Sequence, residues 1–131
     1  MTLLLDTHIW VWSADGGAKL SREVRRQITN PNNEIYLSPV SIWEAQHLYV
    51  RKRLRTKLSF QAWLDEALIH MPLREALFTF AVAAEAAAIE LPQPDLGDVF
   101  LAATARVYNL TLVTADPQLL TCSWLKTLPN E

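Results

Sequence analysis

Near its N-terminus the chain carries an apolar run that passes into three polar residues, Thr2-Leu3-Leu4-Leu5-Asp6-Thr7-His8. A short, continuous run of this kind is typical of a strand that is buried on both faces, as in a parallel sheet. A second such run, Leu110–Thr114, lies near the other end of the chain and is soon followed by Asp116. If both strands are central and parallel, Asp6 and Asp116 emerge at the same edge of the sheet.

The segments between the two runs alternate between helical and strand patterns. Helices are predicted over residues 8–14, 22–29, 39–53, 60–68, 75–90 and 98–108, and further strands over 35–37, 70–73 and 125–128. Ser21, Ser38 and Ser59 stand where helix N-caps are expected, and Pro39 suits the first turn of its helix. The alternation predicts a three-layer α/β/α fold with a mainly parallel central sheet, and the length predicts a single domain over residues 1–131.

The composition excludes several classes of protein. Half of the residues are hydrophobic and 20% are charged, which is typical of a globular domain rather than a disordered chain. The single cysteine, Cys122, excludes a disulfide framework and a zinc site built from cysteines. No basic segment precedes the first apolar run, and uncharged stretches such as 76–84 are far shorter than the ~18 residues of a membrane helix. We therefore expect a cytoplasmic protein that does not enter a membrane.

Basic residues are concentrated in one part of the chain. Residues 19–57 contain nine Lys and Arg and three Glu, a balance of +6, whereas the rest contains three basic residues and eleven acids, a balance of −8. The densest segment contains no acid and holds Arg51, Lys52, Arg53, Arg55 and Lys57. Such a cluster in an otherwise acidic chain suggests a binding surface for a polyanion such as RNA. The alternative is a solvated helix end, since cations there complement the helix dipole.

Four acidic residues stand out by their positions: Asp6, Glu44, Asp98 and Asp116. Taken singly, each aspartate lies at the start of a predicted helix and can cap or support it, as Asp95 can. Glu44 has no such explanation, because it shares one face of its predicted helix with apolar residues such as Trp43 and Leu48. A carboxylate there must be protonated, bound to a cation or paired, for instance in a salt bridge with Arg51.

If the four acids converge, their chemistry points to a hard metal ion. Clustered carboxylates repel one another, and their pKa values rise unless a cation is present. A set of oxygen ligands suits Mg²⁺ or Mn²⁺ rather than Zn²⁺. Such ions polarise a phosphate oxygen and activate a bound water, and two of them about 4 Å apart are the usual arrangement for phosphodiester cleavage. The acids would then hold the metal that cuts RNA, while the basic segment holds the RNA backbone.

Four stretches of the chain together resemble a known family: Leu3-Leu4-Leu5-Asp6-Thr7-His8, Ser41-Ile42-Trp43-Glu44, Asp95-Leu96-Gly97-Asp98 with Leu101-Ala102-Ala103-Thr104-Ala105, and Leu112-Val113-Thr114-Ala115-Asp116-Pro117. Their order and spacing are similar to those of the PIN domain, specifically of the VapC-type toxins of bacterial and archaeal toxin–antitoxin pairs. The resemblance covers nearly the whole chain. It implies a PIN-like fold, a metal-dependent endoribonuclease, a homodimer, a VapB-like antitoxin as partner, and structured RNA such as tRNA or rRNA as substrate.

The resemblance also assigns roles to single residues. It implies that Asp6, Glu44, Asp98 and Asp116 surround the metal ions, with the hydroxyl of Thr114 close by and with Asp95 and Thr7 in supporting positions. The chain departs from the family pattern between and just after the two later aspartates. Relatives often have proline, phenylalanine and arginine where this chain has Leu96, Gly97 and Val99. The missing arginine removes a cation that would help to position a phosphate.

Other functional classes fit the sequence less well. A phosphatase of the haloacid-dehalogenase type has a second aspartate where this chain has His8, and a P-loop hydrolase requires a G-x-x-x-x-G-K segment that is absent. The serious alternative is a non-catalytic PIN-like module for RNA binding or protein interaction, but concentrated acids facing a polyanion argue against it. The three histidines are not spaced as a metal triad. We expect the five tryptophans in the core or at a subunit interface, although Trp10 and Trp12 cannot face the same way on one helix.

Overall fold

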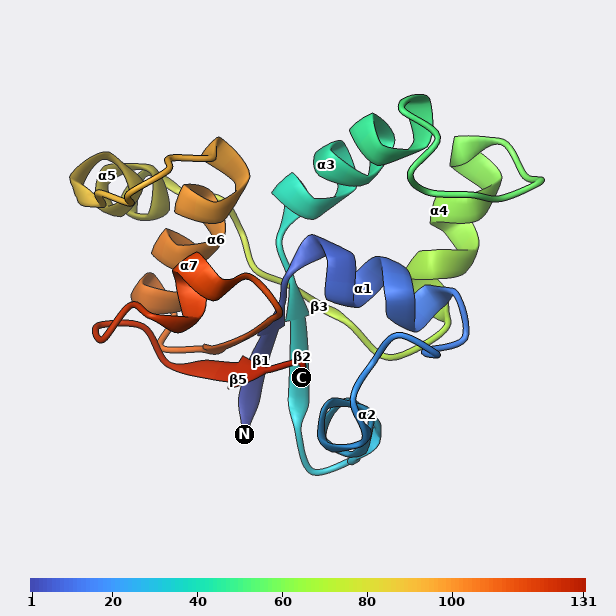
Figure 1. The fold of residues 1–131 in the computed structure, drawn as a ribbon, viewed down its shortest axis with the longest axis horizontal. Coiled ribbons are helices and arrows are strands. Elements are labelled where there is room, and N and C mark those ends of the chain that lie inside the picture. The colour runs from blue at the N-terminus through green and yellow to red at the C-terminus, as the bar shows by residue number, and fades with distance from the viewer.

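The computed structural model describes residues 1–131 and places one five-stranded sheet between two layers of helices (Figure 1). β1 (Thr2–Leu5) lies in the centre, paired in parallel with β2 (Glu34–Leu37) on one side and β4 (Thr111–Thr114) on the other. The edge strands β3 (Arg74–Glu75) and β5 (Thr127–Pro129) are also parallel to their neighbours. The predicted α/β/α fold, with the two apolar runs side by side in a parallel sheet, is confirmed.

The two layers of helices cover opposite faces of β1. One layer consists of α1 (Thr7–Ala14), α2 (Arg22–Thr29), α3 (Pro39–Val50) and α4 (Phe60–Ile69), and the other of α5 (Phe80–Ala88), α6 (Leu96–Val107) and α7 (Pro117–Leu120). Leu3 and Leu5 pack into the core of the first layer and Leu4 into that of the second, and all three are fully buried. Burial on both faces explains why the strand is apolar throughout. None of the helices combines the length and the hydrophobicity that a membrane-spanning helix requires.

Serine side chains begin three of the helices in the first layer, as predicted. The hydroxyls of Ser21, Ser38 and Ser59 accept hydrogen bonds from backbone N–H groups in the first turns of α2, α3 and α4. Each bond satisfies a helix donor that would otherwise lack a partner and stabilises its helix by about 1 kcal/mol. The cap of α3 fixes where that helix starts, and therefore where Glu44 lies relative to the end of β2.

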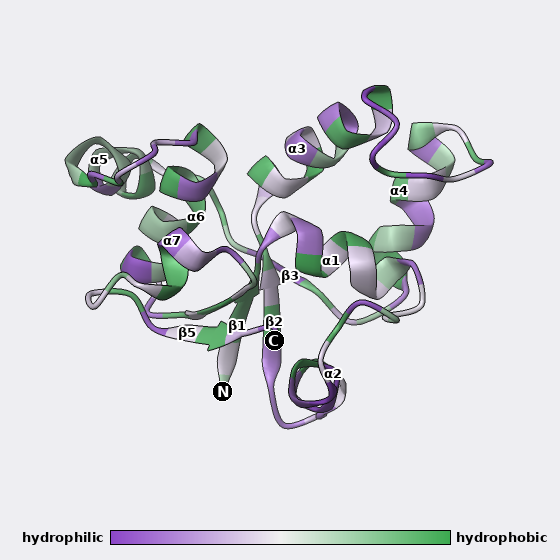
Figure 2. Cartoon of the chain, in the orientation of Figure 1, coloured by the Kyte–Doolittle hydropathy of each residue, from purple (hydrophilic) through white to green (hydrophobic).

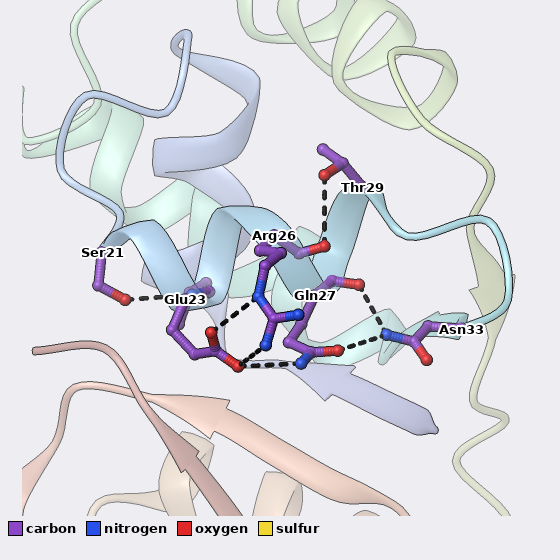
Figure 3. Close-up of polar contacts among 7 residues, drawn as sticks. Ser21, Glu23, Arg26, Gln27, Thr29 and Asn33 are labelled. Atoms are coloured by element: carbon purple, nitrogen blue, oxygen red, sulfur yellow. Dashed lines mark hydrogen bonds and ion pairs between the residues drawn. The ribbon is translucent and has the colours of Figure 1, made fainter.

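α2 is a largely hydrophilic helix at the end of the sheet where β1 and β2 begin (Figures 1 and 2). Glu23 accepts hydrogen bonds from Arg26 at 2.7 and 3.0 Å and from Gln27 at 2.9 Å, and Asn33 donates to two oxygens of Gln27 (Figure 3). These contacts tie α2 to the start of β2. Because α2 lies at the opposite end of the sheet from the carboxyl ends of the strands, its arginines are far from that edge, and the basic part of the sequence is divided between two places.

Two predictions in the middle of the chain are wrong. Residues 70–73 are irregular, and strand pairing begins only at Arg74, opposite Tyr36 of β2. The N–H of Ala76 then donates to the carbonyl of Leu37 at 2.9 Å, so the predicted helix over 75–90 cannot begin there. α5 starts at Phe80 and ends at Ala88 instead. The helix propensity of the alanines is outweighed by pairing with β2.

Several predicted boundaries shift for local reasons. α3 ends at Val50 rather than at 53, because Lys52 has a left-handed backbone with φ 59°. α6 begins at Leu96 rather than at 98, because Asp95 caps it. β5 covers residues 127–129 rather than 125–128, since Leu112, Val113 and Thr114 pair with those residues. The short helix α7 begins at Pro117, as the Asp116-Pro117 pair indicates, although its end was not predicted.

Candidate active site at the carboxyl edge of the sheet

Asp6 lies directly after β1, at the carboxyl edge of the sheet. It occupies the N-cap position of α1, yet its side chain makes no capping hydrogen bond, so the capping explanation is wrong for this residue. Its Oδ2 instead accepts a 2.6 Å hydrogen bond from the Thr114 hydroxyl at the end of β4. Burial raises the pKa of Asp6, and the nearby charge of Asp116 raises it further, against the lowering effects of Thr114 and His8. Asp6 is therefore a buried acid, only 8% exposed, that lacks a cationic partner in the core.

Glu44 projects from α3 toward the start of α1. The Thr7 hydroxyl donates to its Oε1 at 2.6 Å and lies 2.8 Å from the hydroxyl of Ser41. Since a hydroxyl carries one hydrogen, Ser41 donates to Thr7 when Thr7 donates to Glu44. Burial raises the pKa of Glu44, the Thr7 hydrogen bond opposes this, and the charges of Asp6 and Asp95 add to the rise. The sequence did not single out Ser41, although a polar residue one helical turn before Glu44 is a signal of this contact.

Two expectations about α3 are wrong. Glu44 forms no salt bridge with Arg51, since the ion pairs of the structure involve other residues. The face that Glu44 shares with Trp43 is not buried either, because Trp43 is 61% exposed. Ser41 and Ala45 are the fully buried residues of α3. The fully buried positions of α3 are therefore small residues, whereas Ile42, Leu48 and Tyr49 are only partly buried against the core.

Gly97 in the first turn of α6 makes room for Glu44. A Cβ atom at this position would overlap the Glu44 carboxylate and lie 2.6 Å from its Cδ. The starts of α3 and α6 lie side by side at the carboxyl edge (Figure 1). The sequence marks Gly97 only as a departure from the family pattern. The structure shows that the absence of a side chain there lets a carboxylate from another helix approach the α6 backbone.

The three later aspartates lie at the starts of α6 and α7. Asp95 caps α6 by accepting from the N–H groups of Gly97 at 2.8 Å and Asp98 at 3.3 Å, and Asp116 caps α7 by accepting from Gln118 at 2.9 Å. Capping is thus the correct description of these two residues. Asp98 differs, because burial, a hydrogen bond with Asp116 and the negative charges of Asp116, Asp6 and Asp95 raise its pKa to about 8. At neutral pH Asp98 is therefore mostly protonated.

The structure brings the four predicted acids to one edge of the sheet from four different elements. Asp6 follows β1, Glu44 lies on α3, Asp98 lies on α6 and Asp116 precedes α7. Burial, together with the charge of another acid in this group, raises the pKa of Asp6, Glu44 and Asp98. As they stand, no three acidic, histidine or cysteine side chains are arranged as ligands of one ion. Their donors are all oxygens, and the ionised forms of Asp6, Glu44 and Asp98 are destabilised. This donor set fits Mg²⁺ or Mn²⁺, which would neutralise the shared charge.

The departures at positions 96 and 99 have different structural outcomes. Val99 is buried in the core between α5, α6 and β4, so no charged group is available from this position. Leu96 is 68% exposed and lies next to the acids without taking part in their hydrogen bonds. A cation that contacts a phosphate must therefore come from elsewhere in the chain.

The basic loop, which we define as residues 51–57, follows α3 and is mostly hydrophilic (Figure 2). Its five cationic residues, Arg51, Lys52, Arg53, Arg55 and Lys57, are all exposed, and none forms an ion pair. Leu54 is buried and anchors the loop. The N–H groups of Lys52 and Arg53 donate back to the carbonyls of Tyr49 and Leu48 at 3.1 and 2.8 Å, which closes the end of α3. The left-handed backbone of Lys52 costs about 1 kcal/mol relative to glycine.

Comparison with known proteins identifies the family of the chain. The family model described as "PIN domain" matches residues 3–122, whereas no curated protein matches the sequence. The fold is similar to the structure of VapBC2 from Rickettsia felis bound to a promoter DNA fragment, with a TM-score of 0.67, 20% identity and full coverage of both chains. It is also similar to VapBC-1 from nontypeable Haemophilus influenzae, with a TM-score of 0.68, 14% identity and 98% of each chain covered. A third similar structure is FitAcB from Neisseria gonorrhoeae, with a TM-score of 0.61, 22% identity and 96% of each chain covered. The chain belongs to the PIN-domain family.

Proposed function

We propose that the chain is a metal-dependent endoribonuclease and acts as the toxin of a VapC-type toxin–antitoxin pair. The observation that carries this proposal is the group of carboxylates at the edge of the sheet. Asp6 is buried without a cationic partner, and Asp98 has a pKa of about 8 because it is partly buried and because other acids surround it. A stable fold has no need of such a group, because unpaired buried charge is costly. A divalent cation would turn the same group into a favourable site.

Within this proposal each residue has a defined task. Asp6, Glu44, Asp98 and Asp116 would hold the Mg²⁺ or Mn²⁺, which, when bound, supplies an activated water and polarises a phosphate oxygen. Thr114 orients Asp6, whereas Thr7 and Ser41 orient Glu44. Asp95 fixes the first turn of α6 and therefore the position of Asp98. The basic loop would hold the RNA backbone.

The proposal includes partners and a substrate class. The similar structures named above are VapBC and FitAcB complexes, which supports a VapB-like antitoxin as the inhibitor of this chain. Phe80 is 97% exposed and Trp43 61%, so apolar surface is available for an antitoxin or for a second copy in a homodimer. We propose tRNA or rRNA as the substrate, residues 1–131 as one catalytic domain, and the cytoplasm as the place of action.

The second candidate is a non-catalytic module that binds RNA. One observation favours it: the acids are not arranged around a single point as metal ligands. A cleavage experiment separates the two candidates. Protein freed of any copurifying partner is incubated with total tRNA and rRNA in Mg²⁺, Mn²⁺ or EDTA, and new 5′ ends are mapped. Discrete cuts that disappear in EDTA and in Asp98→Asn support the nuclease, whereas RNA binding in EDTA without any cuts supports the module.

Removal of the Asp98 charge is expected to stabilise the metal-free protein at high pH. Its pKa is raised from 3.8 to about 8, so the folded protein binds more protons than the unfolded chain between these values, and stability falls as the pH rises through this window. After a discount for partial exposure, Asp98→Asn should add about 2 kcal/mol at pH 8, or roughly 5 °C in Tm.

This stability prediction is checked by thermal unfolding in EDTA at pH 5 and pH 8. The gain should be smaller at pH 5, because this pH lies only slightly above the unfolded-state pKa of 3.8 and the folded protein still keeps the proton of Asp98 there. Addition of Mn²⁺ should stabilise the unsubstituted protein more than the variant. A variant that is less stable than the original protein at both pH values would show that the Asp98 carboxyl group is a structural partner.

Neutralisation of the basic loop is expected to weaken RNA binding and to flatten its dependence on salt. Each phosphate contact to single-stranded RNA contributes about −0.7 to the slope of log K against log salt, so the loss of all five cations should reduce the slope by up to about 3.5. Fluorescence anisotropy in EDTA measures this slope. Arg22→Gln with Arg25→Gln on α2 is the matched control and should leave it unchanged. Equal slopes for the loop variant and the original protein would mean that the loop is only a solvated helix end.

A further inference from the structure

A groove of about 410 Å³ runs along one face of α1 to the basic loop. His8 and Trp12 line it from one side of α1, and Asp15 lines it from the C-cap position of that helix. Lys52, Arg53 and Arg55 line it from the loop, and Lys19 from the segment after α1. Figure 1 shows α1 beside both α3 and α4, with the loop extending from the end of α3 toward α4.

One end of the groove lies toward the acids. His8 lines this end from the first turn of α1, two residues beyond Asp6 at the carboxyl end of β1. The opposite end is formed by the cations of the loop. A ligand that fills the groove would therefore extend from the candidate metal site to the basic loop.

The lining of the groove combines positive charge with an aromatic surface. Four Lys and Arg side chains line it against one acid, Asp15, while Leu48, Leu54 and Trp63 provide apolar contacts. The ring of Trp12 is partly exposed. The centroid of the His8 ring lies 5.8 Å from the centroid of the Trp12 ring, and the Nζ atom of Lys19 also lies 5.8 Å from it. Both contacts are loose, so the indole can exchange them for a closer partner. A flat base on a charged phosphate, that is, a nucleotide, satisfies both features of the lining.

We propose that this groove binds one unpaired nucleotide of the RNA substrate beside the phosphate that is cut, with its base stacked on Trp12 and its phosphate on Lys52 and Arg55. This inference rests on the proposed nuclease function and extends it, because it assigns a residue that recognises a base. Stacking on an aromatic side chain tolerates different bases, so Trp12 selects an unstacked nucleotide rather than a sequence.

Lys52 allows the phosphate contact to be tested without loss of the fold. Its φ of 59° is one that glycine adopts more readily than lysine does. Lys52→Gly therefore removes the ammonium group and relaxes the backbone at the same position. Asn109 has the equivalent backbone at the end of α6, with φ 54°, and does not line the groove, so Asn109→Gly is the matched control.

The test measures the binding of short single-stranded RNAs in EDTA, so that no cleavage is required. A series of oligonucleotides carries one abasic nucleotide at each position in turn. The unsubstituted protein should lose affinity at one position, by about 5- to 100-fold. Trp12→Leu should bind the intact RNA as weakly as that abasic RNA and no longer distinguish the two, whereas Trp12→Phe should retain most of the effect. Circular dichroism and Tm of each variant establish that it is folded.

Lys52→Gly should weaken binding and reduce the salt slope by about 0.7, while Asn109→Gly should change neither. Wild-type affinity for intact RNA in folded Trp12→Leu, or an abasic effect that persists in this variant, would overturn the proposal. So would binding of acidic peptides but not of RNA. These outcomes are separate from the fate of the nuclease proposal: a protein that never cuts RNA but shows the abasic effect through Trp12 would retain the groove and lose the nuclease.

Discussion

Replacement of Asp6 by asparagine is expected to lower the rate of RNA cleavage by about 10³-fold or more, which corresponds to about 4 kcal/mol of transition-state stabilisation. Asparagine has the same shape as aspartate, and its amide oxygen can still accept the hydrogen bond from Thr114. The negative charge that would hold the cation is lost. The fold should remain intact, because the replaced carboxylate is buried and its ionised form is disfavoured by that burial.

The rate is measured under single-turnover conditions at saturating Mn²⁺, with Tm as the measure of folding. Asp65→Asn is the matched control: Asp65 lies on α4, accepts a hydrogen bond from Gln61 at 2.9 Å, and is remote from the four acids in the sequence and in the fold. This control should cleave RNA at the original rate. A folded Asp6→Asn protein that cleaves within tenfold of the original rate would remove Asp6 from the proposed metal site.

The second large effect is expected from Gly97→Ala. The added Cβ would overlap the Glu44 carboxylate, so Glu44 must leave its position or α3 and α6 must move apart. We expect cleavage to fall by about 100-fold, since a misplacement of about 1 Å is enough for such a loss, and stability to fall by about 1–3 kcal/mol, as in overpacked cores. Alanine adds only one methyl group, and the atoms that this group would meet all belong to Glu44, so a large effect can be attributed to that contact.

A double-mutant cycle identifies the cause. Glu44→Ala removes the group that clashes, so in the background of Gly97→Ala it should restore stability without restoring activity. Leu96→Ala is the neighbouring control, because Leu96 is exposed and lies outside the hydrogen bonds of the site. Independent stability effects of Gly97→Ala and Glu44→Ala would contradict the close contact between α3 and α6.

The fold could be predicted where local pattern and tertiary position agree. Helices cover both faces of β1, so Leu3, Leu4 and Leu5 are all buried. The continuous apolar run that results is enough to predict a central parallel strand from the sequence. The serine caps are likewise local features with local consequences. The prediction failed around Glu75, where alanine-rich sequence favours a helix but β2 offers an unpaired edge. Competition with a distant strand is not visible in a window of neighbouring residues.

The candidate site was also predictable only where local sequence decides the structure. The four acids were identified as a group from their positions after strands and on helices, and the structure places them at one edge of the sheet. Whether an aspartate caps its helix could not be decided from the sequence, and Asp6 and Asp116 turned out differently. The importance of Gly97 and Ser41 depends on the distance between α3 and α6 and on the contact of α3 with α1. No spacing within either helix contains that information.

The hydrogen bond between Asp6 and Thr114 joins residues that are 108 positions apart, and β1 needs β4 to complete its pairing. During synthesis, Asp6 is therefore made 108 residues before Thr114 is added and still longer before Asp116. Until then β1 has one open edge, and the acids have neither their hydroxyl partner nor their fourth member. The candidate centre therefore cannot assemble before residues 114–116 have left the ribosome, and any harmful activity would begin only after that point of translation.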